Sequence, residues 1–387
     1  MIGKAAIAGL GITEMGKVYD RTTIGFAADA IAFALDDAGL HKRDVDGLFV
    51  AASMAPESAR PLVQLWLGFE DLSVFNVLNA AGSTAGTMLQ YASMAIDGGL
   101  AEVIVIVHAD APLAPGGSAG QAYRNASVPS GISGLRSAYG DFGANVSYAQ
   151  ATQRHMHLYG TTSEQLGAIA VAEREWAQLN PRAQMHNKPL TLADHQSSRM
   201  IVEPLHLFDC CLVSNGAIAF VVTSAQRAAT LPQPPVHIRG VGQAAPGDNQ
   251  HAGRDPWIHT GATKAAELAF RQAHITRDEI DQLQLYDCYT YTVLVTLEDY
   301  GFCPKGEGGP FVADGKLGPG GSLPTNTGGG QLSGYYMWGF TPLSEAVIQI
   351  RGQGGQRQQR KHDHVLVSGN GGTFNFHSTT ILSTQPA

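Results

Sequence analysis

A turn of small residues precedes a helical apolar pattern at residues 78–89, LNAAGSTAGTML. Such a turn often positions a nucleophile at the start of a buried helix, where the helix dipole and the first N–H groups stabilise an anion. This turn offers Gly82 and Ser83 but no cysteine. The sequence therefore has a place for covalent chemistry without the usual sulfur, and the question is which reaction such a site performs.

The composition predicts a compact protein with two similar halves. The chain has 387 residues, of which 44% are hydrophobic and 15% are charged. At roughly 100–200 residues per domain, this length favours two domains. The low charge suggests that part of the surface lies in a subunit interface. The formal net charge of −8 argues against nucleic acid as the main ligand.

Cysteine usage and the N-terminus bear on location. The four cysteines, Cys210, Cys211, Cys288 and Cys303, show no CxxC spacing, so we expect no zinc ribbon or other metal site on this chain. An adjacent pair and two scattered thiols fit a reducing compartment. The first residues lack the pattern of a signal peptide, and no run approaches about 18 apolar residues. We expect a cytoplasmic protein without a membrane span.

Three segments of the first half recur in the same order in the second half. The pairs are AAIAGLG (5–11) with VHIRGVG (236–242), residues 34–50 with 269–285, and EVIVIVHAD (102–110) with DHVLVSGNG (363–371). The first pair predicts a strand that ends in Gly-x-Gly. The second pair predicts the end of a helix, then a polar turn and a strand. The third pair predicts an apolar strand. Ordered recurrence favours internal duplication over the general likeness of α/β proteins.

The expected fold is a duplicated α/β/α/β/α layered sandwich. Its N-terminal half comprises residues 1–109 and 200–232, and its C-terminal half comprises 233–387. Between them, 110–199 is expected to be an inserted loop region. The beginning of this insertion is rich in Gly, Ser, Pro and Ala and lacks periodicity, which suggests a functional loop. Residues 22–38 predict a helix that begins at a threonine.

Ordered motifs along essentially the whole chain resemble those of the thiolase superfamily, in its sterol-carrier-protein branch. The motifs are residues 159–185, residues 198–228, YDCYTYTVLVTLEDYGFC (286–303), NTGGGQLSGYYMWG (326–339) and SGNGGTF (368–374). The resemblance implies a thiolase-like fold. In that family, a cysteine at the start of a buried helix takes up an acyl group and a histidine activates it. A second cysteine near the C-terminus moves the proton for carbon–carbon bond formation.

All three catalytic groups of the family pattern are absent here. The nucleophilic cysteine falls on Gly82, the histidine on Tyr336, and the C-terminal cysteine at about Gly369. The family's strand-end motif, Asn-Glu-Ala-Phe or His-Asp-Cys-Phe, falls on 286–289 and begins with Tyr286. This pattern is similar to that of the lipid-transfer-protein-like aldolases of steroid side-chain degradation. Those enzymes have a thiolase fold, lack the cysteine and use tyrosines to cleave a β-hydroxyacyl-CoA.

Retro-aldol cleavage explains a site that has tyrosines and no nucleophile. A base removes the β-hydroxyl proton, the Cα–Cβ bond breaks, and an acid protonates the acyl-CoA enolate. We expect Tyr286 to take the first proton and Tyr336 to protonate the enolate, with the reverse assignment left open. Because tyrosine has an ordinary pKa near 10, a base role requires a lowered pKa or a water relay. Gly82 is expected to make room for a bulky substrate, steroid-derived or aromatic.

Other residues are expected to bind the substrate. Gly371 and Gly372 are candidates for an oxyanion hole, although glycines there also permit a tight turn. Asn326 is expected to hold a loop or a water molecule. Ser83 lies one residue past the nucleophile position, and it is expected to cap the helix rather than to act as a nucleophile.

Several neighbours are expected to support the site from behind. Asp287 follows a tyrosine at a strand end, so its side chain should point the other way and be structural. Cys288 is expected to pack, and Tyr335 is a possible support for the catalytic groups. Either His155 or His157 is a candidate to line the substrate channel, with a helix-surface position as the simpler interpretation. Core packing is the expectation for Tyr289, Tyr291, Cys210 and Cys211.

The resemblance also implies the partners. CoA is expected as part of the substrate, with no cofactor on this chain. A homodimer is expected, together with a separate OB-fold and zinc-ribbon subunit in a dimer of heterodimers. Two alternatives to an aldolase remain open: a thiolase-like acyltransferase with another nucleophile, and a non-catalytic subunit that binds a lipid or CoA. Two tyrosines stand at positions where the family pattern has other polar groups, and this replacement favours the aldolase.

Overall fold

The computed structural model describes residues 4–52, 63–123, 130–140, 143–246, 255 and 257–386. Within these ranges, nine strands form one sheet in the order β3-β2-β4-β7-β1-β8-β11-β10-β9, and β5-β6 form a separate hairpin. The strands are β1 (Ala5–Ile12), β2 (Gly47–Ala51), β3 (Val74–Leu78), β4 (Val103–Asp110), β5 (Met200–Val202), β6 (Leu205–His206), β7 (Gly216–Ser224), β8 (Val236–Ala244), β9 (Gln282–Gln284), β10 (His364–Gly371) and β11 (Phe376–Ser383).

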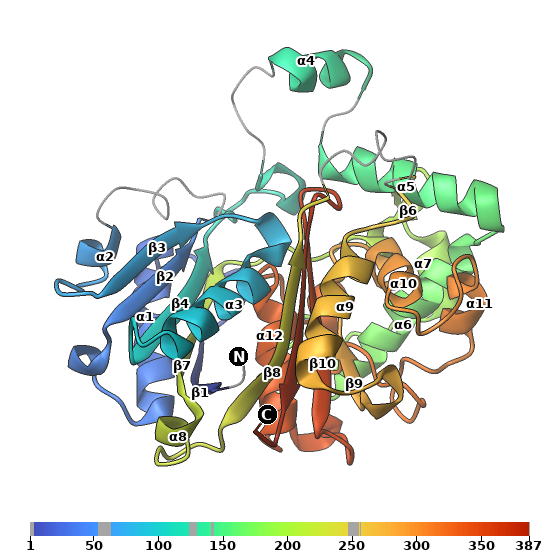
Figure 1. The fold of residues 1–387 in the computed structure, drawn as a ribbon. Coiled ribbons are helices and arrows are strands. Elements are labelled where there is room, and N and C mark those ends of the chain that lie inside the picture. Colours follow the sequence, from blue (N-terminus) through green and yellow to red (C-terminus); the bar gives the residue numbers. More distant parts are fainter. Residues whose placement is uncertain are drawn as a thin grey trace.

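The helices lie in layers on both sides of this sheet and between its two halves (Figure 1). They are α1 (Thr23–Ala38), α2 (Val63–Trp66), α3 (Thr84–Asp97), α4 (Gly131–Ala138), α5 (Ala144–Tyr159), α6 (Ser163–Gln178), α7 (Leu192–Ser197), α8 (Ala225–Ala228), α9 (Ala262–Ala273), α10 (Thr290–Asp299), α11 (Gly308–Ala313) and α12 (Phe340–Ile350). Helix α1 shares a core with the first half of the sheet. Helices α3 and α12 share one core with strands of both halves, and α9 and α10 pack on the second half. This is the expected five-layer sandwich.

The predicted duplication is visible in how helices pack on the two central strands. These strands, β1 and β8, pair antiparallel where the halves meet. An added Cβ at Gly9 or Gly11 of β1 would lie 2.2 or 2.0 Å from backbone oxygens of α1. At Gly240 and Gly242 of β8 it would lie 2.1 and 2.0 Å from backbone oxygens of α9. The repeated Gly-x-Gly therefore lets a helix backbone approach the sheet equally closely in both halves.

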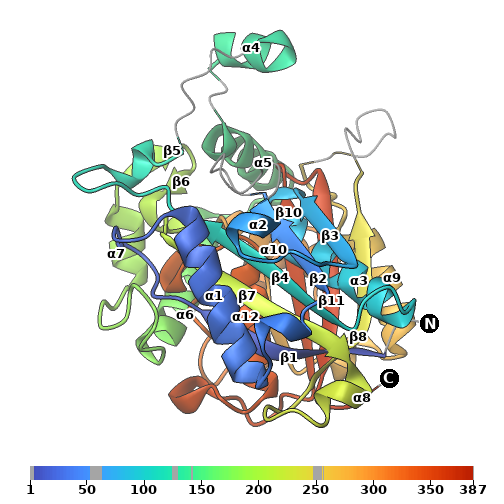
Figure 2. The same ribbon diagram turned by 90° about the vertical axis from the view of Figure 1, so that its left-hand side faces the viewer.

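The predicted helix at 22–38 is confirmed with its threonine cap. Thr22 Oγ1 accepts the Gly25 N–H at 3.1 Å, and Gly39 ends α1 with a φ of 65°. The other face of the sheet's first half packs on α3, so that half is covered on both sides (Figure 2). All residues of β4 are buried, as its unbroken apolar run predicts.

The expected insertion is largely helical. It holds α4, α5, α6 and α7, and α4 projects from the body above α5 (Figures 1 and 2). Part of the predicted functional loop, 124–129, lies outside the described residues. The boundaries expected at 109/110, 199/200 and 232/233 remain a prediction. No helix of the described ranges has the length and apolar character to cross a membrane.

Candidate active site

The two predicted catalytic tyrosines meet in the centre of the molecule. Tyr286 follows β9 and precedes α10, and Tyr336 follows a short π-helix, η8 (Gly330–Gly334). Their hydroxyl oxygens are 3.2 Å apart, within hydrogen-bond distance. Tyr286 is buried and Tyr336 is half-buried. Two phenols from segments 50 residues apart thus form one hydrogen-bonded pair.

Backbone hydrogen bonds to serine side chains hold both tyrosines in place. The Tyr286 N–H donates to Ser368 Oγ of β10 at 2.9 Å. The Tyr336 N–H donates to Ser214 Oγ, also at 2.9 Å. Ser214 in turn accepts a hydrogen bond from Gln184 Nε2 at 2.6 Å. Each phenol is therefore positioned from its own backbone, which leaves its hydroxyl group to face the other.

Gly82 stands directly against the ring of Tyr286. An added Cβ at Gly82 would lie 2.1 Å from Tyr286 Cζ and 2.4 Å from Cε2. It would also lie 2.2 Å from the carbonyl oxygen of Asn370. The expectation that Gly82 makes room for a bulky substrate therefore needs correction. The space that a side chain at this position would need is filled by the ring of Tyr286.

Both phenols stay protonated at neutral pH. Burial, followed by the proximity of Tyr336 and Cys288, holds the pKa of Tyr286 well above its ordinary value. Burial and the proximity of Cys211 act in the same direction on the pKa of Tyr336. The lowered pKa that a free tyrosinate base requires is thus not what this environment produces. The pair is suited to pass a proton along a hydrogen bond rather than to hold a negative charge.

Ser83 does not cap α3, contrary to expectation. Its side chain makes no capping hydrogen bond, and the hydroxyl of the neighbouring Thr84 instead fixes the turn before the helix. Thr84 Oγ1 accepts the Ala80 N–H at 2.9 Å and donates to the Ala81 carbonyl at 2.6 Å. Because Ser83 has a helical backbone conformation, its side chain lies on a face shared with other residues of α3.

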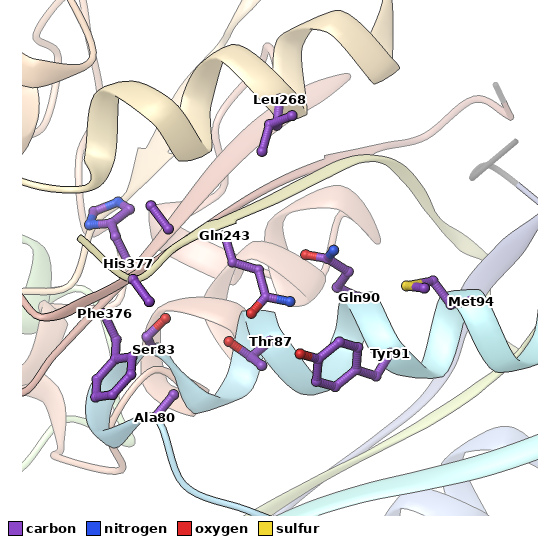
Figure 3. Close-up of a pocket in the computed structure, with 12 residues that line it drawn as sticks. Ala80, Ser83, Thr87, Gln90, Tyr91, Met94, Gln243, Leu268, Phe376 and His377 are labelled. Carbon is purple, nitrogen blue, oxygen red and sulfur yellow. The ribbon is translucent and has the colours of Figure 1, made fainter. Parts of the chain in front are cut away.

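Ser83 borders a cavity of about 340 Å³ between α3, α9 and the ends of β8 and β11. Figure 3 shows its hydroxyl in the same cavity as the side chains of Thr87, Gln243 and His377. The lining is mixed, with polar side chains such as Gln90 and Gln243 beside apolar ones such as Met94 and Phe376. It begins at the turn that carries Gly82, so it lies beside the tyrosine site.

Asn326 holds a loop, as expected. It has a φ of 53°, its Oδ1 accepts the Leu285 N–H at 2.6 Å, and its Nδ2 donates to Glu173 at 2.8 Å. Both ends of the amide are thus engaged by protein groups, so the loop-holding role is the one the contacts support.

The C-terminal glycines allow close packing of the turn before α3. A Cβ at Gly371 would lie 2.2 Å from the Ala80 carbonyl, and Gly372 has a φ of 59°. A Cβ at Gly369 would lie 2.5 Å from Ser378 Oγ. These contacts show why glycine is needed at the three positions. Their role in an oxyanion hole remains a prediction.

The expected supporting residues lie around the pair. Asp287 Oδ2 accepts the N–H groups of Gln331 and Leu332 in η8, at 2.6 and 3.0 Å. Cys288 is buried. Tyr335 points toward α12, where its hydroxyl hydrogen-bonds Ser344 at 3.1 Å. Asp287 is thus structural as predicted, and Tyr335 stands apart from the tyrosine pair.

The histidine expectation is wrong for His155. Its side chain is fully buried, with Nδ1 2.8 Å from Thr161 and Nε2 3.1 Å from Glu298. It is neither on the helix surface nor free to line a channel. His157 is exposed, as the simpler interpretation predicts.

Core packing is confirmed for Tyr289 and Tyr291, while the adjacent cysteines are only half-buried. Both tyrosines belong to the second core, and the Tyr291 hydroxyl donates to the Trp257 carbonyl at 2.7 Å. Cys210 and Cys211 pack against the edge of the same core.

Two residues near the site were not predicted. Tyr148 of α5 accepts a hydrogen bond from Asn370 at 3.3 Å and lies close enough to Tyr286 to raise its pKa. Glu173 of α6 is buried beside Asp287. A signal for Glu173 exists in the sequence, because it falls on the apolar stripe that includes Leu166 and Ala170. No group of three metal-ligating side chains occurs in the part of the chain that the structure describes.

The fold and the site together define a thiolase-fold enzyme in which a phenol stands where the nucleophile would be. Residues 242–384 match the family model "Thiolase C-terminal domain-like". The chain is 39% identical to a steroid side-chain-cleaving aldolase of Thermomonospora curvata, over 90% of this chain and 91% of that protein. It is 36% identical to 17-hydroxy-3-oxo-4-pregnene-20-carboxyl-CoA lyase of Mycobacterium tuberculosis, over 90% and 92%.

A solved structure of the Ltp2-ChsH2(DUF35) aldolase matches with a TM-score of 0.87 and 36% identity, over 99% of this chain and 98% of that one. The chain therefore belongs to the family of thiolase-fold aldolases and CoA lyases that includes these proteins. The predicted resemblance, the fold class and the class of carbon–carbon lyase are confirmed.

Proposed function

We propose that this protein cleaves the side chain of a β-hydroxyacyl-CoA, steroid-derived, by a retro-aldol reaction. The products are a ketone or aldehyde and a shortened acyl-CoA. The observation that carries the proposal is the pair of neutral phenols, 3.2 Å apart, in a turn that excludes a nucleophile at position 82. The names of the relatives, an aldolase and a CoA lyase, support the substrate class.

The tyrosine pair supplies both proton transfers of this reaction. Tyr286 accepts the β-hydroxyl proton and passes its own proton to Tyr336 as the carbonyl forms and the Cα–Cβ bond breaks. In the same step Tyr336 passes its proton to Cα, which takes the electron pair of the broken bond. The reaction thus consumes no net proton. We assign Tyr286 to the β-hydroxyl proton and Tyr336 to Cα. Because the hydroxyls are hydrogen-bonded to each other, the proton that one accepts balances the proton that the other donates.

The enolate oxygen needs hydrogen-bond donors as negative charge develops on it. We propose that backbone N–H groups around Gly371 and Gly372 supply them, with the turn at Gly82 and Ser83 forming the opposite wall. The close packing of Gly371 on the Ala80 carbonyl brings these two segments together. CoA takes part only as the thioester portion of the substrate.

We also propose a homodimer built on the edge of the first half of the sheet. β3 is an edge strand, and Phe75 on it is exposed, as are Tyr91 and Met94 on the neighbouring α3. An edge strand that carries an exposed apolar side chain favours pairing with another chain, and exposed apolar groups on a helix can add to such an interface. A separate OB-fold and zinc-ribbon subunit completes the proposed assembly, supported by the Ltp2-ChsH2(DUF35) structure. The four free thiols fit a cytoplasmic location.

Product analysis tests the proposed reaction. The purified chain, with and without a DUF35-type partner, is mixed with panels of β-hydroxyacyl-CoA and β-ketoacyl-CoA thioesters and followed by mass spectrometry. The proposal expects a ketone or aldehyde plus a shortened acyl-CoA, formed without free CoA. Cleavage of β-keto substrates only when free CoA is present, with an acyl-enzyme on Ser83, would indicate an acyltransferase. Binding without cleavage would indicate a non-catalytic subunit. Either result contradicts the aldolase.

A further inference from the structure

Two carboxyl groups lie together in the core behind the tyrosine pair. Glu173 of α6 and Asp287, next to Tyr286, are both buried, with exposed fractions of 2% and 0%. An added Cβ at Gly330 would lie 2.2 Å from Asp287 Oδ2 and 2.5 Å from Glu173 Oε2, so both oxygens border the same glycine. Neither residue takes part in an ion pair with any described side chain.

Each of these carboxyl groups has one buried oxygen without a hydrogen-bond donor in the described part of the chain, so one added proton would complete their hydrogen bonding. No donor from another described residue reaches Glu173 Oε2 or Asp287 Oδ1. The two side chains instead lie close enough to interact directly, and this interaction acts to raise the pKa of Glu173 and to lower that of Asp287. Two buried carboxylates that border the same glycine repel each other strongly when both are charged and no cation lies between them. A proton on Glu173 satisfies the pair.

The pair joins the two segments that carry the tyrosines. Asp287 Oδ2 accepts the N–H groups of Gln331 and Leu332, which begin the π-helix before Tyr336. Glu173 Oε1 accepts a hydrogen bond from Asn326, whose other end fixes the backbone N–H of Leu285, directly before Tyr286. One side of the pair thus holds the Tyr336 segment and the other side holds the Tyr286 segment.

We propose that Glu173 and Asp287 share a single proton, and that this protonated pair is a positioning device that holds Tyr286 and Tyr336 in hydrogen-bond contact. Neither residue touches the reacting atoms. The proton lets two carboxyl groups tie both tyrosine segments to α6 without an unpaired buried charge. The positioning role rests on the proposed function, whereas the shared proton does not.

No full positive charge competes for the pair in the described surroundings. Arg174, the next residue of α6, donates instead to Ser333 Oγ at 2.8 Å and to the Lys188 carbonyl at 2.9 Å. Glu345 of α12, across Gly330, is neutralised by Arg357 at 2.9 Å. The thiols of Cys211 and Cys288 face Asp287, and burial raises the pKa of both, so they add no charge.

Stability as a function of pH tests the shared proton without any assay of activity. Burial and the neighbouring Asp287 raise the pKa of Glu173 in the folded protein. Above the ordinary pKa of a glutamate, near 4.3, the folded state then holds a proton that the unfolded state has lost. Stability falls as pH rises toward the folded pKa, and the unfolding constant increases by up to about tenfold per pH unit.

Two variants and the wild-type protein are compared for this dependence. Glu173→Gln keeps a donor and an acceptor but carries no titratable proton, and we expect its unfolding constant to lose this rise with pH. Glu175→Gln, an exposed neighbour on α6, serves as the matched control and should retain the wild-type slope. Equal slopes for Glu173→Gln and wild type would overturn the shared proton, whether or not the protein proves to be an aldolase.

Kinetics test the positioning role. Glu173→Ala should lower kcat by at least tenfold with KM within threefold, and Glu173→Gln should restore most of kcat because it still donates to Asp287. If Glu173→Gln loses as much activity as Glu173→Ala, or if neither loses any, the positioning role is wrong. Should Glu173→Ala fail to fold, the pH dependence of kcat still decides. The kcat of the wild type should fall at alkaline pH as the pair loses its proton, and the kcat of Glu173→Gln should not show this fall. An equal fall in both proteins would contradict the positioning role.

Discussion

The ring of Tyr286 occupies the space that a side chain at Gly82 would need. The ring carbon Cζ lies 2.1 Å from the position of an added Cβ. A phenol at the end of β9 and a side chain at the start of α3 therefore exclude each other. A nucleophilic side chain at position 82 and the phenol of Tyr286 in its present place cannot both be accommodated. The absence of the nucleophile and the presence of the phenol therefore have one steric cause.

A cysteine placed at position 82 should not restore thiolase chemistry. Gly82→Cys should displace the Tyr286 ring, lower the free energy of unfolding by roughly 1–3 kcal/mol and abolish aldol cleavage. Urea unfolding and product analysis check this result. Gly120→Ala is the control, because an added Cβ at Gly120 has no neighbour within 4 Å. A stable Gly82→Cys protein that forms an acyl-enzyme would show that the ring yields the space freely.

Removal of either hydroxyl group should stop catalysis while leaving the fold intact. Tyr286→Phe and Tyr336→Phe should each lower kcat by about 10²–10⁴-fold. Because we propose that the hydroxyls act as one proton-transfer pair, the double variant should be little worse than the single ones. Tyr335→Phe, which loses only a hydrogen bond to Ser344, is the matched control and should keep near wild-type kcat. Losses that multiply in the double variant would indicate two independent roles.

The state of the phenols can be read from a spectroscopic pH titration. Burial raises the pKa of both Tyr286 and Tyr336, so neither should ionise below about pH 10. The tyrosinate absorbance of wild type and of the double Phe variant should therefore coincide from neutral pH up to that point. An absorbance step near pH 7 that disappears in Tyr336→Phe would instead identify a tyrosinate base.

Much of the fold was predictable from short patterns. The Gly-x-Gly pairs at 9–11 and 240–242 predicted two equivalent strands, and the structure shows that helix backbones pack on them. Comparison with the family motifs likewise identified Tyr286 and Tyr336, because each stands where the motif has another polar residue. Their contact was not predictable from spacing alone, since it depends on where η8 ends and on the backbone bonds to Ser214 and Ser368.

The failures have a common physical cause. Charged and polar residues were interpreted from their local sequence, whereas their partners come from distant segments. His155 was expected on the helix surface or in a substrate channel, but it is buried against Glu298, which lies 143 residues away. Ser83 looks like a helix cap, but the adjacent Thr84 reaches the turn first. Such competition is decided by tertiary packing, which the pattern of a single segment does not contain.

His155 provides a last test, because its side chain is fully buried and its partner Glu298 lies 143 residues away. Although burial opposes the shift, the hydrogen bond from His155 and the charge of Lys305 lower the pKa of Glu298. A depressed carboxyl pKa contributes stability at neutral pH that is lost as pH falls through the folded pKa.

His155→Ala should therefore lower the free energy of unfolding at pH 7 by about 1–3 kcal/mol and reduce the loss of stability on acidification, with KM for the acyl-CoA unchanged. Chemical denaturation at several pH values and steady-state kinetics check both expectations. His157→Ala, exposed on the same helix, should change stability by less than about 0.5 kcal/mol. A raised KM in His155→Ala with unaltered stability would instead indicate that His155 lines the substrate channel. Only the removal of a group that contacts the substrate weakens binding without weakening the fold.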